Sequence, residues 1–151
     1  MNKIFGKPQL TPYEADYARW CAEQGALLRE GNLQELDREN LAEEIESSGR
    51  SDKREIESRL NVLLVHLLKW RFQPDQRAGS WKATITEQRW RISRVVKDSP
   101  SLNSYPRKVL AEEYALARSN AATETGLFAD AFPSDCPFSI GQVLDLEFFP
   151  E

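Results

Sequence analysis

The stretch IESRLNVLLVHLLKWRF, residues 56–72, is the most apolar part of the chain and decides its fold. Because a helix turns by about 100° per residue, side chains spaced by three or four positions share one face. Five aliphatic residues follow that spacing, namely Ile56, Leu60, Leu63, Leu64 and Leu67. From Val62 onward the opposite side also becomes apolar, so this half should have neighbours on several sides. The run is shorter than the roughly 20 residues that cross a membrane, and it predicts a buried central helix over residues 52–72.

Capping residues and helix breakers predict further helices around this one. Thr11 and Pro12, followed by Glu14, favour a helix start, and a glycine such as Gly31 favours a helix end. The other expected helices cover residues 12–30, 33–48, 80–98 and 104–125, and Gly31, Gly49, Pro100 and Gly126 end them in turn. Residues 127–151 hold five phenylalanines and three prolines. This composition predicts an irregular tail with a short helix after Ser139 and with its rings packed on the bundle.

The expected fold class is all-α, because no segment alternates with the period of a strand. We expect a single-domain bundle of about five helices over residues 11–149, preceded by an N-terminal extension of residues 1–10. The chain has 151 residues, of which 29% are charged and 40% hydrophobic, as in ordinary soluble domains. Its first ten residues lack the apolar core of a signal peptide. Cys21 and Cys136 form no CxxC pair, which favours reduced thiols in a cytoplasmic protein that does not span a membrane.

Charge is distributed unevenly along the chain. Residues 11–46 carry ten acidic and three basic side chains, whereas residues 50–97 carry five acidic and twelve basic ones. Residues 98–151 are acidic again, with nine acidic and three basic side chains. Segments of opposite charge can neutralise one another when they pack together, so the basic middle segment does not by itself indicate nucleic-acid binding.

Several blocks of the sequence resemble a bacterial family, the domain of unknown function 29. The blocks are LAEEIE at 41–46, HLLKW at 66–70, Ser80-Trp81 and Gln88-Arg89, together with Trp20, Leu27-Leu28, Asp37, Phe132-Pro133 and Cys136-Pro137. The resemblance covers roughly residues 11–149. Ser48 departs from the family pattern, in which a leucine is expected before Gly49. The resemblance implies a small bacterial helical bundle and implies no particular activity.

Polar side chains interrupt the apolar arc of the helix expected over residues 33–48. Asp37, Asn40 and Glu44 fall inside the arc that runs from Leu36 to Ile45. An inward carboxylate needs a partner, because an isolated buried charge is costly. The basic middle segment offers Arg59, His66, Lys69 and Arg89. One hypothesis is therefore a structural buried polar network of Asp37, Asn40, Glu44, Arg59, His66 and Lys69.

The alternative hypothesis is an enzyme or metal site on the same residues. His66, the only histidine, could act as a general base or metal ligand oriented by Asp37 or Glu44, with Asn40 beside them. A single histidine without an ExxH motif cannot build the di-iron site of ferritin-like bundles. Zinc would need mainly carboxylate ligands, which is unusual. The sequence therefore favours a protein without a metal or cofactor and leans against an enzyme.

The helix expected over residues 80–98 carries a possible interaction surface. Its basic residues are interleaved with an aromatic one, and the set is Lys82, Arg89, Trp90, Arg91, Arg94 and Lys97. Such a surface suits nucleic-acid phosphates, a protein partner, or merely solvent. We expect a non-enzymatic interaction module that binds a protein partner or self-associates, with a nucleic-acid-binding or regulatory role as an alternative.

Overall fold

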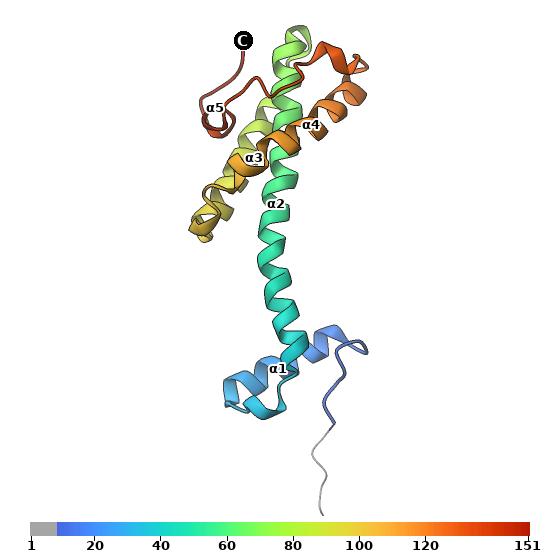
Figure 1. The fold of residues 1–151 in the computed structure, drawn as a ribbon, viewed down its shortest axis with the longest axis vertical. Coiled ribbons are helices and arrows are strands. Elements are labelled where there is room, and N and C mark those ends of the chain that lie inside the picture. The colour runs from blue at the N-terminus through green and yellow to red at the C-terminus, as the bar shows by residue number, and fades with distance from the viewer. Residues whose placement is uncertain (1–8) are drawn as a thin grey trace, which may run out of the picture. The chain divides into compact units, whose positions relative to one another are not determined.

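The computed structural model describes residues 9–151, which form five α-helices joined by short 3₁₀ turns (Figure 1). The helices are α1 (Tyr17–Glu30), α2 (Arg38–Phe72), α3 (Gly79–Asp98), α4 (Tyr105–Thr125) and α5 (Ile140–Leu144). The part of the chain that is described contains no strand, so the predicted all-α class is confirmed. The N-terminal extension predicted for residues 1–10 falls mostly outside the described residues and stays a prediction.

The described residues fall into two compact units, residues 9–49 and 50–151. In the first unit, the buried side chains among the described residues are Trp20, Gln24 and Leu27. All three lie on one side of α1, because they follow one another at helical spacing. The helix begins after Asp16, whose carboxylate accepts a hydrogen bond from the backbone of Arg19, and it ends at Gly31.

The second unit is built on residues 56–68 of α2. Ile56, Leu60, Leu63, Leu64 and Leu67 are fully buried, as the spacing predicts. Ile85 and Ile92 of α3 and three residues of α4, Tyr114, Ala117 and Ala121, pack in the same core. The prediction of a central apolar helix is therefore confirmed for its second half.

The aromatic tail closes one side of this core. Phe132 and Phe138 are buried, and the ring of Phe132 meets that of Phe72 edge-on with centroids 5.4 Å apart. The short helix α5 begins where Ser139 and Gln142 form a reciprocal capping box, in which each side chain bonds the other residue's backbone. The tail thus packs as predicted, although Phe128 is 87% exposed.

Several predicted helix boundaries are wrong. The predicted helices at residues 33–48 and 52–72 are one helix, α2, from Arg38 onward, and Leu33–Glu35 forms a 3₁₀ turn before it. Gly49 lies inside α2 and does not end a helix. Its φ angle is not positive, whereas Gly31 ends α1 with a positive φ angle. A glycine inside a helix costs about 1 kcal/mol relative to alanine but does not stop the helix. The first helix also begins later than Thr11, because Asp16 provides the cap.

Replacing Gly49 by alanine should stabilise the first unit by up to about 1 kcal/mol, since alanine restricts the unfolded chain and favours helix. The added methyl group meets no atom within 4 Å. Gly31→Ala is the matched control: it also has free space, but its φ of +76° strains any other residue. Melting temperatures should therefore move in opposite directions, and a lowered value for Gly49→Ala would contradict a continuous helix.

Candidate functional site

Asp37 lies at the start of α2 and connects it with α1. Its carboxylate accepts hydrogen bonds from Trp20 Nε1 at 3.1 Å and Asn40 Nδ2 at 2.8 Å. Its backbone N–H donates to the side-chain oxygen of the buried Gln24 at 2.8 Å. These bonds hold α2 against α1 within the first unit. The predicted association of Asp37 with Asn40 is thus present, and Trp20 is an additional partner.

Glu44 binds two tyrosines of the same unit. One carboxylate oxygen of Glu44 accepts a hydrogen bond from the Tyr13 hydroxyl, and the other accepts one from the Tyr17 hydroxyl at 2.7 Å. The tyrosine rings contact Trp20, with centroids 4.9 Å away for Tyr13 and 6.1 Å for Tyr17. We call Tyr13, Tyr17, Trp20, Asp37 and Glu44 the aromatic–acid cluster. The helical spacing of Tyr13 and Tyr17 could be read from the sequence, but nothing in the sequence predicted that their hydroxyl groups would bind Glu44.

The structure gives other partners to the basic residues of the predicted network. Arg59 binds Glu55 at 2.9 Å and Gln88 at 3.2 Å. Lys69 binds Glu124 at 3.2 Å and lies over the Trp81 ring. These contacts are all inside the second unit, whereas Asp37, Asn40 and Glu44 have theirs in the first. The structure therefore shows partners for each of these residues within its own unit, and the predicted pairing of the acidic residues with the basic ones stays a prediction.

The acidic members of the aromatic–acid cluster should make stability fall in acid. Hydrogen bonds from Tyr13 and Tyr17 hold the pKa of Glu44 below its usual 4.5. The bond from Asn40, followed by that from Trp20, holds the pKa of Asp37 below 3.8, although partial burial opposes this shift. Because folding favours the ionised carboxylates, they add to the free energy of unfolding at pH values above 4.5 and 3.8, the ordinary pKa values that apply to the unfolded chain. This contribution is lost as the pH falls through the lower folded values.

The melting temperature of the wild type should therefore drop as the pH falls below 4.5. Glu44→Gln should show a shallower drop, because the amide does not titrate. Glu39→Gln, an exposed neighbour on α2, is the control and should follow the wild type. Calorimetric scans over this pH range check the result, and parallel curves for wild type and Glu44→Gln would contradict it.

His66 lies half-buried on the part of α2 that belongs to the second unit. Its Nδ1 is 2.8 Å from the Val62 carbonyl oxygen, and since a carbonyl can only accept, Nδ1 carries the proton. Burial lowers the pKa of His66 below 6.5, which favours the neutral ring. The residue lines a pocket of about 360 Å³ whose polar members are Asn61, Asn120, Thr123 and Glu124. Val62 is thus the hydrogen-bond partner that the structure shows for His66, and its orientation by Asp37 or Glu44 stays a prediction.

No group of three or more histidine, cysteine or acidic side chains within residues 9–151 is arranged to hold a metal ion.

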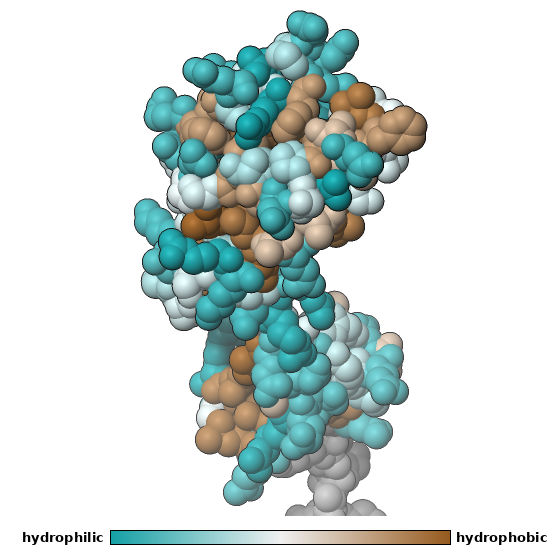
Figure 2. All heavy atoms as spheres, turned by 45° about the horizontal axis from the view of Figure 1, so that its top comes forward, coloured by the Kyte–Doolittle hydropathy of each residue, from teal (hydrophilic) through white to brown (hydrophobic). Residues whose placement is uncertain are grey.

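The exposed side of α3 carries most of the predicted interaction surface. Trp90 is 58% exposed, and Arg94 follows one helical turn later. Lys82, Arg91 and Lys97 are exposed as well. Figure 2 shows hydrophobic residues at the molecular surface among larger hydrophilic areas. An exposed tryptophan is typical of surfaces that bind a partner protein. We call Trp90, Arg91, Arg94 and Lys97 the α3 surface.

Arg89 does not belong to this surface, and its prediction as a surface residue is wrong. Its side chain is 2% exposed and lies on the core side of α3, four residues after Ile85 and three before Ile92. Its Nε donates to the Val143 carbonyl at 2.7 Å and its Nη2 to the Gln142 carbonyl at 3.2 Å. The helical spacing from the isoleucines could have identified this burial, but the charge of the residue argued against it.

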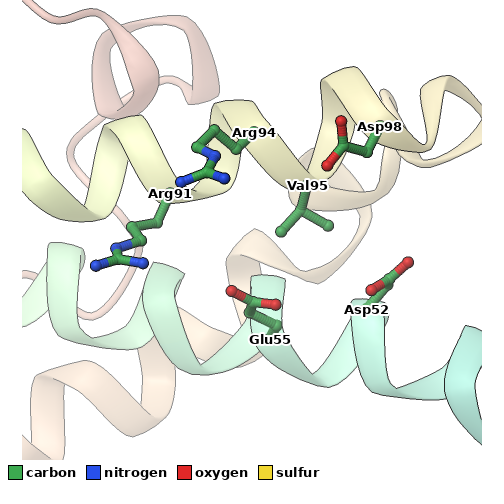
Figure 3. Close-up of a pocket in the computed structure, with 6 residues that line it drawn as sticks. All are labelled: Asp52, Glu55, Arg91, Arg94, Val95 and Asp98. Carbon is green, nitrogen blue, oxygen red and sulfur yellow. The ribbon is translucent and has the colours of Figure 1, made fainter.

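A polar groove borders the α3 surface. It has a volume of about 290 Å³ and is lined by Asp52, Glu55, Arg91, Arg94, Val95 and Asp98. Figure 3 shows the two arginines projecting from α3 and the carboxylates of Asp52 and Glu55 from α2. Arg91 also pairs with Glu87 at 3.3 Å on its own helix. The groove therefore presents both signs of charge, and the exposed Trp90 directly precedes its lining residue Arg91 on α3.

No helix within residues 9–151 is long and apolar enough to cross a membrane. The model of one protein family, described as "Domain of unknown function DUF29", matches residues 12–149. No curated protein and no solved structure matches the chain.

Proposed function

The chain belongs to the domain of unknown function DUF29 family, and we propose that it is a non-enzymatic interaction module of the bacterial cytoplasm. It binds a protein partner through the α3 surface. The observation that carries this proposal is the 58% exposure of Trp90 next to Arg94 and the mixed-charge groove. Tryptophan and arginine dominate the binding energy of protein interfaces, because they bury large areas and make several directed contacts.

The charges of the groove favour a protein partner over a nucleic acid. Three carboxylates, those of Asp52, Glu55 and Asp98, share the groove with Arg91 and Arg94. Nucleic-acid binding gains its affinity from cations that neutralise successive phosphates, and carboxylates at the same place repel phosphates. A protein segment can instead offer a base to the carboxylates and an acid to the arginines. Arg94 and Lys97 are available for such contacts, because neither has an ion pair among the described residues.

Trp90→Ala tests the proposal directly. Tagged wild type and variants are recovered from the host after mild cross-linking, and bound proteins are compared by quantitative mass spectrometry. A protein that binds the wild type directly is then purified and titrated by calorimetry. Trp90→Ala should weaken this binding at least about tenfold. Leu116→Ala is the matched control, because Leu116 is 54% exposed on α4 and lies outside the groove.

Other outcomes identify the alternatives. Equal binding by wild type and Trp90→Ala would reject the α3 surface as the interface. A co-purifying nucleic acid, whose affinity falls steeply with salt, would support the nucleic-acid hypothesis. A concentration-dependent dimer that Trp90→Ala abolishes, seen by analytical ultracentrifugation of the purified chain, would make the partner a second copy.

A further inference from the structure

Two contacts between α2 and α4 flank the pocket beside His66. Asn120 Nδ2 donates a hydrogen bond to Asn61 Oδ1 at 3.2 Å, and Lys69 Nζ donates one to Glu124 Oε2 at 3.2 Å. His66 lies between these contacts on α2, after Asn61 and before Lys69. The pocket has a volume of about 360 Å³, and residues of both helices line it. The two contacts therefore hold the helices on either side of a groove that includes His66. We call it the α2–α4 groove.

The hydrogen bonds of the α2–α4 groove leave acceptor atoms open. Asn61 donates through Nδ2 to the Glu113 carbonyl at 3.4 Å, so its Oδ1 is the atom that faces Asn120. Because Asn120 uses its amide nitrogen for this bond, its own Oδ1 has no donor within residues 9–151. Oε1 of Glu124 has none there either, because Lys69 binds Oε2. The groove thus presents an amide oxygen and a carboxylate oxygen that can each accept a bond.

His66 adds a third acceptor. Its Nδ1 carries the proton that the Val62 carbonyl accepts, so Nε2 of the neutral ring has a free lone pair. Burial lowers the pKa of His66 below 6.5, which favours the neutral ring. Neither this Nε2 nor Oδ1 of Asn120 is buried, because among the buried and half-buried residues described, Nη1 of Arg89 is the one buried side-chain nitrogen or oxygen without a partner. Both acceptors are therefore accessible to solvent.

The charges around the α2–α4 groove favour a cation. Glu124 is the one charged residue of its lining. A second carboxylate, that of Glu113, lies next to the groove with its Oε2 3.5 Å from Asn61 Nδ2. Lys69 contributes one ammonium group, which pairs with Glu124. Two carboxylates are thus close to the lining against one base, so a positive ligand gains more attraction than repulsion.

We propose that the α2–α4 groove binds a small primary alkylammonium ion. The three N–H groups of such an ion match the three acceptors, namely Nε2 of His66, Oδ1 of Asn120 and Oε1 of Glu124. The carboxylate of Glu124 also makes its hydrogen bond charge-assisted. Val62, which is 37% exposed in the lining, offers an apolar surface to a short alkyl group. Since a water molecule takes about 30 Å³ in the liquid, the groove holds roughly twelve water volumes, which limits the ligand to a small molecule.

The test is a titration of the full chain with 2-methylpropan-1-amine, which is protonated at neutral pH, followed by NMR. His66 is the only histidine, so the histidine ring signals report on this groove alone. We expect saturable shifts of these signals and of the Asn120 side-chain amide, with a Kd below about 1 mM. The N-trimethylated amine keeps the charge but has no N–H group, and 2-methylpropan-1-ol has no charge. Each should bind at least about tenfold more weakly.

Two glutamate substitutions locate the binding site. Glu124→Gln keeps the size of the side chain but removes its charge, and it should weaken binding at least about tenfold. Glu87→Gln is the matched control and should bind like the wild type. Glu87 is exposed to a similar degree as Glu124 and also pairs with a base, Arg91, but it lies on α3 outside the groove. The spectrum of each variant shows whether it is folded.

Three outcomes would each overturn the proposal. They are equal binding of the trimethylated amine, unchanged binding by Glu124→Gln, and the absence of saturable shifts with the wild type. The result is independent of the proposed protein interface, because the α3 surface lies outside the α2–α4 groove. Either proposal can therefore fail without the other.

Discussion

Replacing Arg89 by methionine should lower the free energy of unfolding of the second unit by about 2–3 kcal/mol. The methionine keeps the apolar contacts of the arginine stem, but the carbonyls of Gln142 and Val143 lose their charged donor. Hydrogen bonds to charged groups contribute about 1.5–3 kcal/mol each. Removing a buried cation with one unused donor returns part of that loss, which is why the expected sum is smaller than two full bonds.

Arg91→Met is the control for this effect. Arg91 is two residues along the same helix, but its side chain is 48% exposed and pairs with Glu87 one turn away. Exposed pairs of this kind contribute about 0.3–0.5 kcal/mol, so the control should change little. Urea unfolding followed by circular dichroism measures both variants. Equal losses for the two would show that Arg89 does not anchor α5.

Replacing Leu64 by alanine should destabilise the second unit by about 3 kcal/mol, because it removes buried methyl groups and leaves a cavity. Leu64 is fully buried in the core formed with α3, α4 and the tail. Leu116→Ala removes the same atoms from a side chain that is 54% exposed, and it should change stability by less than about 0.5 kcal/mol. A small effect at Leu64 would mean that residues 56–68 are not the centre of the core.

The sequence predicted those features that depend on local chemistry and spacing. The leucines of residues 56–68 are buried because their spacing places them on one face, and Gly31 and Gly126 end helices in the left-handed conformation that glycine adopts readily. Ser139 caps α5 through a bond to a residue three positions away. Each of these outcomes is decided within one or two helical turns, so one sequence is sufficient to predict it.

The features that sequence reasoning missed depend on distant parts of the chain. Gly49 permits both a helix end and a helix interior, and no local rule chooses between them. Asp37 binds Trp20 and Glu44 binds two tyrosines, and these partners from another segment of the chain were not named by the sequence reasoning. Arg89 became a core residue because α5, 53 positions away, supplies carbonyl acceptors. The charge of Arg89 indicated a surface position, although its helical spacing from Ile85 and Ile92 is that of a buried residue.

The unequal burial along α2 has a consequence for how the protein opens. Its seven buried residues all lie between Ile56 and Leu68, whereas the buried side chains described in the first unit are Trp20, Gln24 and Leu27 of α1. Amide hydrogens of α1 and of the first turns of α2 should therefore exchange with solvent through a partial opening of low free energy. Those of residues 56–68 should exchange only when the whole core unfolds. One helix thus belongs to two cooperative units of different stability.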